Sequence, residues 1–196
     1  RDFALTVVQV NANFRNLGKT EIQGIDFTTS YSWKTADFGR FEAGLSLAYI
    51  DSYKIDFIGD GNLVEFIGQG IPADSSDDGF LQWKGQGWLS WSMKGINARL
   101  TGTYTDGFAD LDLDSNPRQV DSTIFYDFQA SYKLFPSKSE SDMKWWTDMK
   151  LTAGVTNLLD TDPPLAQDEG NNSTNYPGHL YTNVGRFVYV QLEKKL

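Results

Sequence analysis

Apolar and polar side chains alternate through most of the chain, a pattern that predicts β-strands rather than helices. In residues 24–33, Ile25, Phe27, Tyr31 and Trp33 share one face, and most of the residues between them are polar. The same period of two recurs in residues 40–49, 87–93, 96–105, 123–134, 148–157 and 184–196. Residues 3–10 form a less regular segment and complete about eight predicted strands. Since no segment has a convincing period of 3.6, we expect an all-β antiparallel fold.

The links between these predicted strands alternate in length. Short links follow residues 33 and 93 and a moderate polar link follows residue 134, whereas long links run through residues 54–79, 106–119 and 160–183. In an antiparallel meander alternate links lie at the same end, so one end carries short turns and the other carries long loops. Outer-membrane β-barrels have this asymmetry. A soluble β-sandwich also alternates, and it is the alternative that the pattern alone leaves open.

Two further features favour a transmembrane β-barrel. Aromatic residues lie near the ends of the apolar rows, with Trp33, Trp91, Tyr132 and Trp145 beside the short links and Tyr49 and Tyr104 beside the long ones. Membrane barrels place such residues in two girdles at the lipid headgroups. The opposite rows are small and polar, and they would fill the interior of an eight-stranded barrel poorly. We therefore expect a wide, wet lumen and strands that belong to a larger barrel.

Composition excludes several classes of function. The chain has 196 residues, a net charge of −9, no cysteine and a single histidine, His179. A nucleic-acid partner is not expected, because such proteins present a basic face. Disulfides, thiolate metal sites and multi-histidine metal sites are excluded, and no phosphate-binding loop or nucleophile elbow occurs. We accordingly expect neither an enzyme nor a cofactor.

The C-terminal region resembles the end of TonB-dependent outer-membrane receptors. That family has a strand reading G-V-x-N-L-F-D-x-D-P-P, a loop, and a final strand that begins G-R followed by aromatic residues. The matching positions here are Gly154, Val155, Asn157, Leu158, Asp160, Asp162, Pro163 and Pro164, followed by Gly185, Arg186 and Phe187. Residues 16–27 and 36–53 resemble an earlier loop and hairpin of the family. Unlike most family members, the chain ends in leucine, which indicates an atypical insertion signal or residues beyond Leu196.

The resemblance implies that residues 1–196 are the C-terminal part of a transmembrane barrel domain and supply about eight strands of a 22-stranded barrel. The plug domain and the earlier strands would lie outside this chain. The implied function is TonB-dependent uptake of a scarce oligosaccharide, siderophore–iron complex or cobalamin-like molecule across the bacterial outer membrane. The implied partners are lipid, lipopolysaccharide, the solute, and the TonB complex acting through the plug. A passive porin, a self-contained small barrel and a soluble β-sandwich binding module are the alternatives.

Two loop regions contain candidate site residues. Asp110, Asp112 and Asp114 offer hard oxygen ligands at alternate positions, which would suit Ca²⁺, although the spacing is not that of an EF-hand. A solvated loop is the alternative for this segment. In the last long link, amides and aromatic rings could bind a sugar or a siderophore, or else pack the loop; these residues are Asn171, Asn172, Tyr176, His179 and Tyr181. Trp83 and Trp88 are candidates for either a ligand platform or a packing role.

Overall fold

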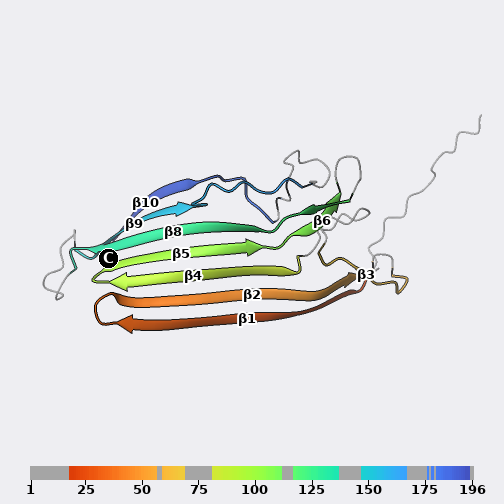
Figure 1. Ribbon diagram of the computed structural model, residues 1–196, viewed down its shortest axis with the longest axis horizontal. Coiled ribbons are helices and arrows are strands. Elements are labelled where there is room, and N and C mark those ends of the chain that lie inside the picture. The colour runs from red at the N-terminus through yellow and green to blue at the C-terminus, as the bar shows by residue number, and fades with distance from the viewer. Residues whose placement is uncertain are drawn as a thin grey trace, which may run out of the picture.

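A computed structural model gives the fold of most of the chain. It describes residues 18–56, 59–68, 81–111, 117–136, 147–166, 176, 178 and 180–194. In this part, one antiparallel sheet runs as a meander of seven long strands, each paired with the next (Figure 1). The strands are β1 (Thr20–Thr35), β2 (Gly39–Ile55), β4 (Trp83–Met93), β5 (Ile96–Thr105), β8 (Thr123–Leu134), β9 (Met149–Thr156) and β10 (Phe187–Lys194). The all-β antiparallel prediction is confirmed.

Each predicted strand from residue 24 onward overlaps one of these seven, while residues 3–10 lie outside the described part. β1, β2 and β4 are each longer than the pattern predicts. A register shift beside Gly24 interrupts the alternation on β1 and β2. At the start of β4, Gly85 and Gly87 have no side chain, so they add nothing to an apolar–polar alternation. Both features hide a strand from a search for alternating side chains.

Short turns join β1 to β2 and β4 to β5 at one end of the sheet (Figure 1). Lys94 and Gly95 connect β4 to β5, and both have positive φ, at 48° and 87°. A two-residue hairpin of this kind matches the twist of the strands that it joins. In the turn between β1 and β2, the Thr35 hydroxyl accepts the Phe38 N–H at 3.0 Å and donates to the Gly39 carbonyl at 3.1 Å. The predicted short-turn end is therefore present.

The opposite end carries the long loops, and two of them contain strands that the sequence did not reveal. β3 (Val64–Glu65) pairs with the end of β2. β6 (Phe108–Leu111) and β7 (Pro117–Val120) form a separate hairpin in the link between β5 and β8. The sequence pattern predicts plain loops there, because each of these strands is too short to show a periodic pattern.

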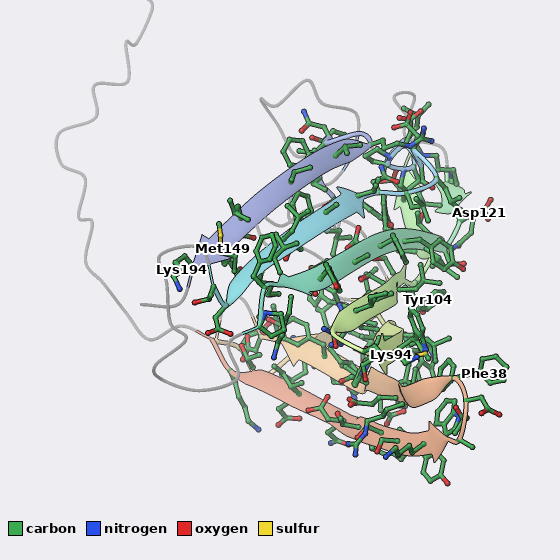
Figure 2. The ribbon with its side chains drawn as sticks, turned by 90° about the vertical axis from the view of Figure 1, so that its left-hand side faces the viewer. Phe38, Lys94, Tyr104, Asp121, Met149 and Lys194 are labelled. Carbon is green, nitrogen blue, oxygen red and sulfur yellow. The ribbon has the colours of Figure 1, made fainter. Side chains whose placement is uncertain are left out.

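The sheet has one apolar and one polar face. Two rows of the apolar face cross all seven strands, Trp33–Phe41–Trp91–Ala98–Ala130–Ala153–Val190 and Tyr31–Ala43–Leu89–Leu100–Phe128–Val155–Val188. Large side chains on this face are open to the surroundings, and Val190 is 71% exposed. Figure 2 shows a curved, open sheet with β1 and β10 at its edges. The chain is thus a partial barrel, and its apolar face has no protein layer over it among the described residues.

Candidate functional site

The polar face presents hydroxyl, amide and charged groups in rows set by strand register. One row reads Lys34–Arg40–Ser92–Asn97–Ser131–Thr152–Gln191, and the next reads Ser32–Glu42–Ser90–Arg99–Gln129–Gly154–Tyr189. Because neighbouring strands lie about 4.8 Å apart, side chains in one row are close enough to act on a common ligand. The register therefore brings together polar groups that are far apart in sequence, such as Gln129 and Tyr189, which are 60 residues apart.

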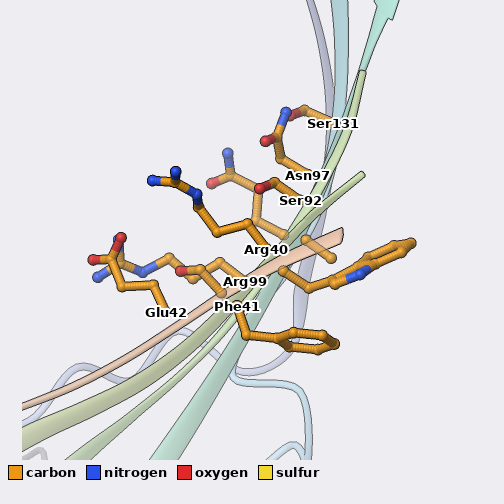
Figure 3. Close-up of a pocket in the computed structure, with 11 residues that line it drawn as sticks. Arg40, Phe41, Glu42, Ser92, Asn97, Arg99 and Ser131 are labelled. Atoms are coloured by element: carbon orange, nitrogen blue, oxygen red, sulfur yellow. The ribbon is translucent and has the colours of Figure 1, made fainter. Parts of the chain in front are cut away.

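These two rows enclose a hollow of about 420 Å³ near the short-turn end, here called the polar hollow. Its lining includes Arg40, Glu42, Asn97, Arg99 and Gln129, which come from β2, β5 and β8. Figure 3 shows the arginine and glutamate side chains leaving the sheet on one side, with the ring of Phe41 on the other. The charged and amide side chains of the polar hollow thus come from the polar face, although Phe41, Trp91 and Ala98 of the apolar row also contribute to its lining.

Trp88 lies on the polar face, where a glycine on the neighbouring strand makes room for its ring. It pairs in register with Gly44, and a Cβ added at Gly44 would overlap the indole ring. The indole therefore lies flat over the backbone of β2. The Arg99 guanidinium lies over the same indole, 5.0 Å from the ring centroid, at a distance typical of a cation–π contact. Trp88 thus acts as a support for Arg99, whereas Trp83 lies on the apolar face 4.5 Å from Tyr49.

Tyr189 repeats this arrangement at the other side of the sheet. Its ring covers Gly154 on β9, at a position where a Cβ would overlap the ring. The Tyr189 hydroxyl donates to Oε1 of Gln129 at 3.2 Å. That hydrogen bond fixes the amide of Gln129 with its nitrogen free to donate elsewhere. At two places on the polar face, an aromatic ring thus lies over a glycine of the neighbouring strand.

Aromatic residues lie where the sequence placed the two girdles. At the short-turn end, Trp33 stacks between Tyr31 and Phe41, with ring centroids 5.8 and 5.5 Å away. The Trp91 indole there donates to the Phe38 carbonyl at 2.6 Å. Trp83 and Tyr49 lie at the long-loop end, while Trp145 is outside the described residues. The apolar face is thus bordered by rings at both ends.

The long loops share a small hydrophobic core, here called the loop cluster. Its buried members are Leu81, Phe108, Val120, Ala166 and Tyr181, contributed by three different links. Phe108 is 1% exposed, and Tyr181 is 7% exposed. Three separate loops therefore pack as one unit at the long-loop end, although they are far apart in sequence.

The predicted ligand residues fall partly on this loop cluster. Tyr176 packs against it, Tyr181 is inside it, and Asn171, Asn172 and His179 lie outside the described residues. Burial raises the pKa of the Tyr181 hydroxyl, and the negative charge of Asp106 acts in the same direction. This placement favours packing for Tyr181, and the ligand-binding role of the set stays a prediction.

One of the three predicted Ca²⁺ ligands has a different partner. Asp110 accepts hydrogen bonds from Nε and Nη2 of Arg118 at 2.8 and 2.6 Å across the β6–β7 hairpin. Its side chain is 3% exposed, and that of Arg118 is 34% exposed. Asp112 and Asp114 lie outside the described residues, so the Ca²⁺ site stays a prediction. Across the described ranges, no group of three or more His, Cys, Asp or Glu residues is placed to hold a metal ion.

Glu65 on β3 ties the first long loop to β2. Its carboxylate accepts from the Ser52 hydroxyl at 2.8 Å and from the Tyr53 N–H at 2.7 Å. The N–H groups of Phe66 and Ile67 donate to it at 3.2 and 3.3 Å. Burial acts to raise the pKa of Glu65, but these hydrogen bonds outweigh burial and hold the pKa below its ordinary value.

The two halves of the C-terminal motif meet at the end of β9. Asn157, with φ of 52°, donates from Nδ2 to the Thr161 carbonyl and accepts the Thr161 N–H, both at 2.8 Å. Asp160 accepts the Arg186 N–H at 2.6 Å, and Nε of Arg186 donates to the Leu158 carbonyl at 3.0 Å. The motif thus closes the long loop and sets the start of β10.

Comparison with known protein families shows which family the chain belongs to. The family model described as "TonB dependent receptor-like, beta-barrel" matches residues 1–158. The chain belongs to this family. No match was found among curated proteins or among solved structures. β10 and the loop before it lie beyond the matched residues, so their assignment to the barrel rests on the pairing of β10 with β9.

Membership gives the function in general terms. TonB-dependent receptors are transporters of the bacterial outer membrane rather than enzymes, and they work with TonB and a ligand. The expected receptor and transport role is therefore confirmed at this level. No helix in the described part of the chain is long and apolar enough to cross a membrane.

Proposed function

We propose that residues 1–196 form a C-terminal part of the barrel wall of a receptor that takes up a scarce oligosaccharide. The observation that carries this choice of solute is the polar face, where Ser, Thr, Asn and Gln side chains from seven strands stand in register. Hydroxyl and amide groups exchange hydrogen bonds with sugar hydroxyls, and aromatic rings offer flat surfaces for sugar rings. Siderophore–iron and cobalamin-like molecules are the alternative solutes.

The apolar face supports the membrane part of the proposal. β4 spans 11 residues from Trp83 to Met93. At about 3.4 Å per residue and a tilt of about 40°, those positions cover about 26 Å, close to the apolar band of about 25 Å in known barrels. Lipid and lipopolysaccharide would cover this face, and the plug and remaining strands of a 22-stranded barrel would come from other segments of the receptor.

Energised uptake by cells that carry the intact receptor tests the proposed function. Labelled oligosaccharides, a ferric siderophore and cobalamin would be supplied separately, in matched strains with and without functional TonB. We expect oligosaccharide accumulation only in the strain with TonB. Accumulation that is equal in both strains would favour the passive porin, and accumulation of another solute class alone would refute the choice of oligosaccharide.

A further inference from the structure

The polar hollow contains two arginines whose guanidinium groups have no ionic or hydrogen-bonding partner among the described residues. Arg40 on β2 and Arg99 on β5 form no ion pair or side-chain hydrogen bond with any group in the part of the chain that the structure describes. Lys34 is the register partner of Arg40 and adds a third positive charge beside the polar hollow. Glu42 is the acidic residue among its lining side chains. The region is therefore locally basic, although the chain has a net charge of −9.

The side chains around these arginines are suited to hydrogen bonding with hydroxyl groups of a ligand. Ser90, Ser92 and Asn97 line the polar hollow, and each both donates and accepts hydrogen bonds. Gln129 offers its amide nitrogen, because its oxygen already accepts from Tyr189. The Glu42 carboxylate only accepts, which makes it a partner for a hydroxyl donor.

The Arg99 guanidinium is also held in place before any ligand arrives. The Trp88 indole beneath it is fixed against Gly44, where a Cβ has no room. A planar guanidinium supported on a ring presents its N–H groups in a fixed fork, and a carboxylate fits that fork with two parallel hydrogen bonds. Less side-chain freedom is then lost on binding.

We propose that the polar hollow is a transit subsite for a hydroxylated carboxylate, of which an acidic sugar residue is the representative. Arg40 and Arg99 bind the carboxylate, while Glu42, Asn97 and Gln129 exchange hydrogen bonds with the hydroxyls. A neutral sugar would leave both guanidinium groups without an anion. This proposal rests on the proposed function, since it narrows the oligosaccharide to an acidic one and places a step of its passage near the short-turn end.

The test compares two solutes in one receptor. Cells carrying the intact receptor would receive a labelled hexuronate disaccharide or the neutral hexose disaccharide with the same linkage, and TonB-dependent uptake would be measured as a function of concentration. The variants are Arg40→Met and Arg99→Met, with Lys84→Met as the control. Lys84 is an exposed residue of the polar face at the long-loop end of β4, away from the polar hollow.

We expect the ratio of acidic to neutral uptake at low concentration to fall roughly tenfold to a hundredfold in each arginine variant, as for the loss of one charge-assisted contact. The control should leave the ratio unchanged. A ratio unchanged in both arginine variants overturns the subsite. Equal loss of both solutes also overturns it, because the arginines would then hold protein rather than solute. Absence of uptake of any sugar by the unmodified receptor would instead refute the proposed function itself.

Discussion

A positive charge at the centre of the apolar face should destabilise the protein far more than the same charge on the polar face. Leu89 on β4 is 46% exposed and lies in a row of apolar residues that crosses all seven strands. In Leu89→Arg a guanidinium would replace an isobutyl group in contact with hydrocarbon. Gln86→Arg is the matched control, since Gln86 is an exposed residue on the polar face of the same strand.

The size of the effect follows from the depth of Leu89. It lies four residues from Met93, which ends β4. At about 2.6 Å of depth per residue after tilt, Leu89 is about 10 Å from that end and about 3 Å from the middle of a 26 Å band. An arginine near the midplane costs about 2–4 kcal/mol. The folding equilibrium should therefore shift by roughly 30- to 700-fold.

Guanidinium unfolding of the intact receptor in lipid vesicles measures this shift, and heat-modified mobility on gels reports the folded fraction. Gln86→Arg should change stability by less than about 0.5 kcal/mol. Met93→Arg, on the apolar face but at its edge, should cost about 0–1 kcal/mol. The reasoning is refuted if Leu89→Arg and Gln86→Arg have equal effects, or if the cost does not depend on depth.

Three further predictions concern single contacts. Gly44→Ala should cost about 1–3 kcal/mol because its methyl group overlaps the Trp88 indole, and a double-mutant cycle with Trp88→Leu should recover most of that loss. Asn157→Ala should lower the unfolding midpoint more than Asn157→Gly, since both lose the hydrogen bonds to Thr161 but only glycine relieves the positive φ; equal midpoints would contradict this. The stabilising effect of Glu65 should be fully present above its ordinary pKa of 4.5 and be lost as the pH falls through its lower folded value. Hydrogen exchange at β3, corrected for intrinsic rates, should show this loss in the wild type and not in Glu65→Gln.

The two faces of the sheet could be predicted because side-chain direction in a strand depends only on sequence parity. Alternation assigns Leu89 to one face and Ser90 to the other before any fold is known. The long and short links follow from the same segmentation. Here the local pattern is sufficient, because each face meets a different environment along its whole length.

The polar hollow could not be predicted in the same way, because it depends on register between strands. Alternation shows that Arg40 and Arg99 lie on the polar face, but not that they line the same hollow. The support of Arg99 by Trp88 depends in turn on Gly44 being opposite the indole. The sequence does show a glycine, Gly44, and a tryptophan, Trp88, on the polar faces of two successive long strands. Only the register shows that the two residues are opposite each other.

The loop cluster was missed for a related reason. Phe108 and Val120 are isolated apolar residues in a polar, aspartate-containing link, so neither shows a periodic neighbourhood. Their burial depends on two other links, the one that precedes β4 and the one that follows β9. The C-terminal motif was visible as a resemblance, but the hydrogen bond from the Arg186 N–H to Asp160, which joins its halves, was not.

Collision measurements on spin labels along β5 test the central claim that one face of the sheet meets lipid and the other meets water. Residues 1–196 contain no cysteine, so single cysteines introduced at residues 96–103 can carry the labels in an intact receptor freed of any cysteine elsewhere and reconstituted in lipid vesicles. We predict that collisions with oxygen, which concentrates in lipid, peak at residues 96, 98, 100 and 102. Collisions with a water-soluble nickel chelate should peak at residues 97, 99, 101 and 103. Low collision rates with both reagents at the even-numbered positions would mean that protein covers the apolar face, as in a soluble β-sandwich, and would contradict the account.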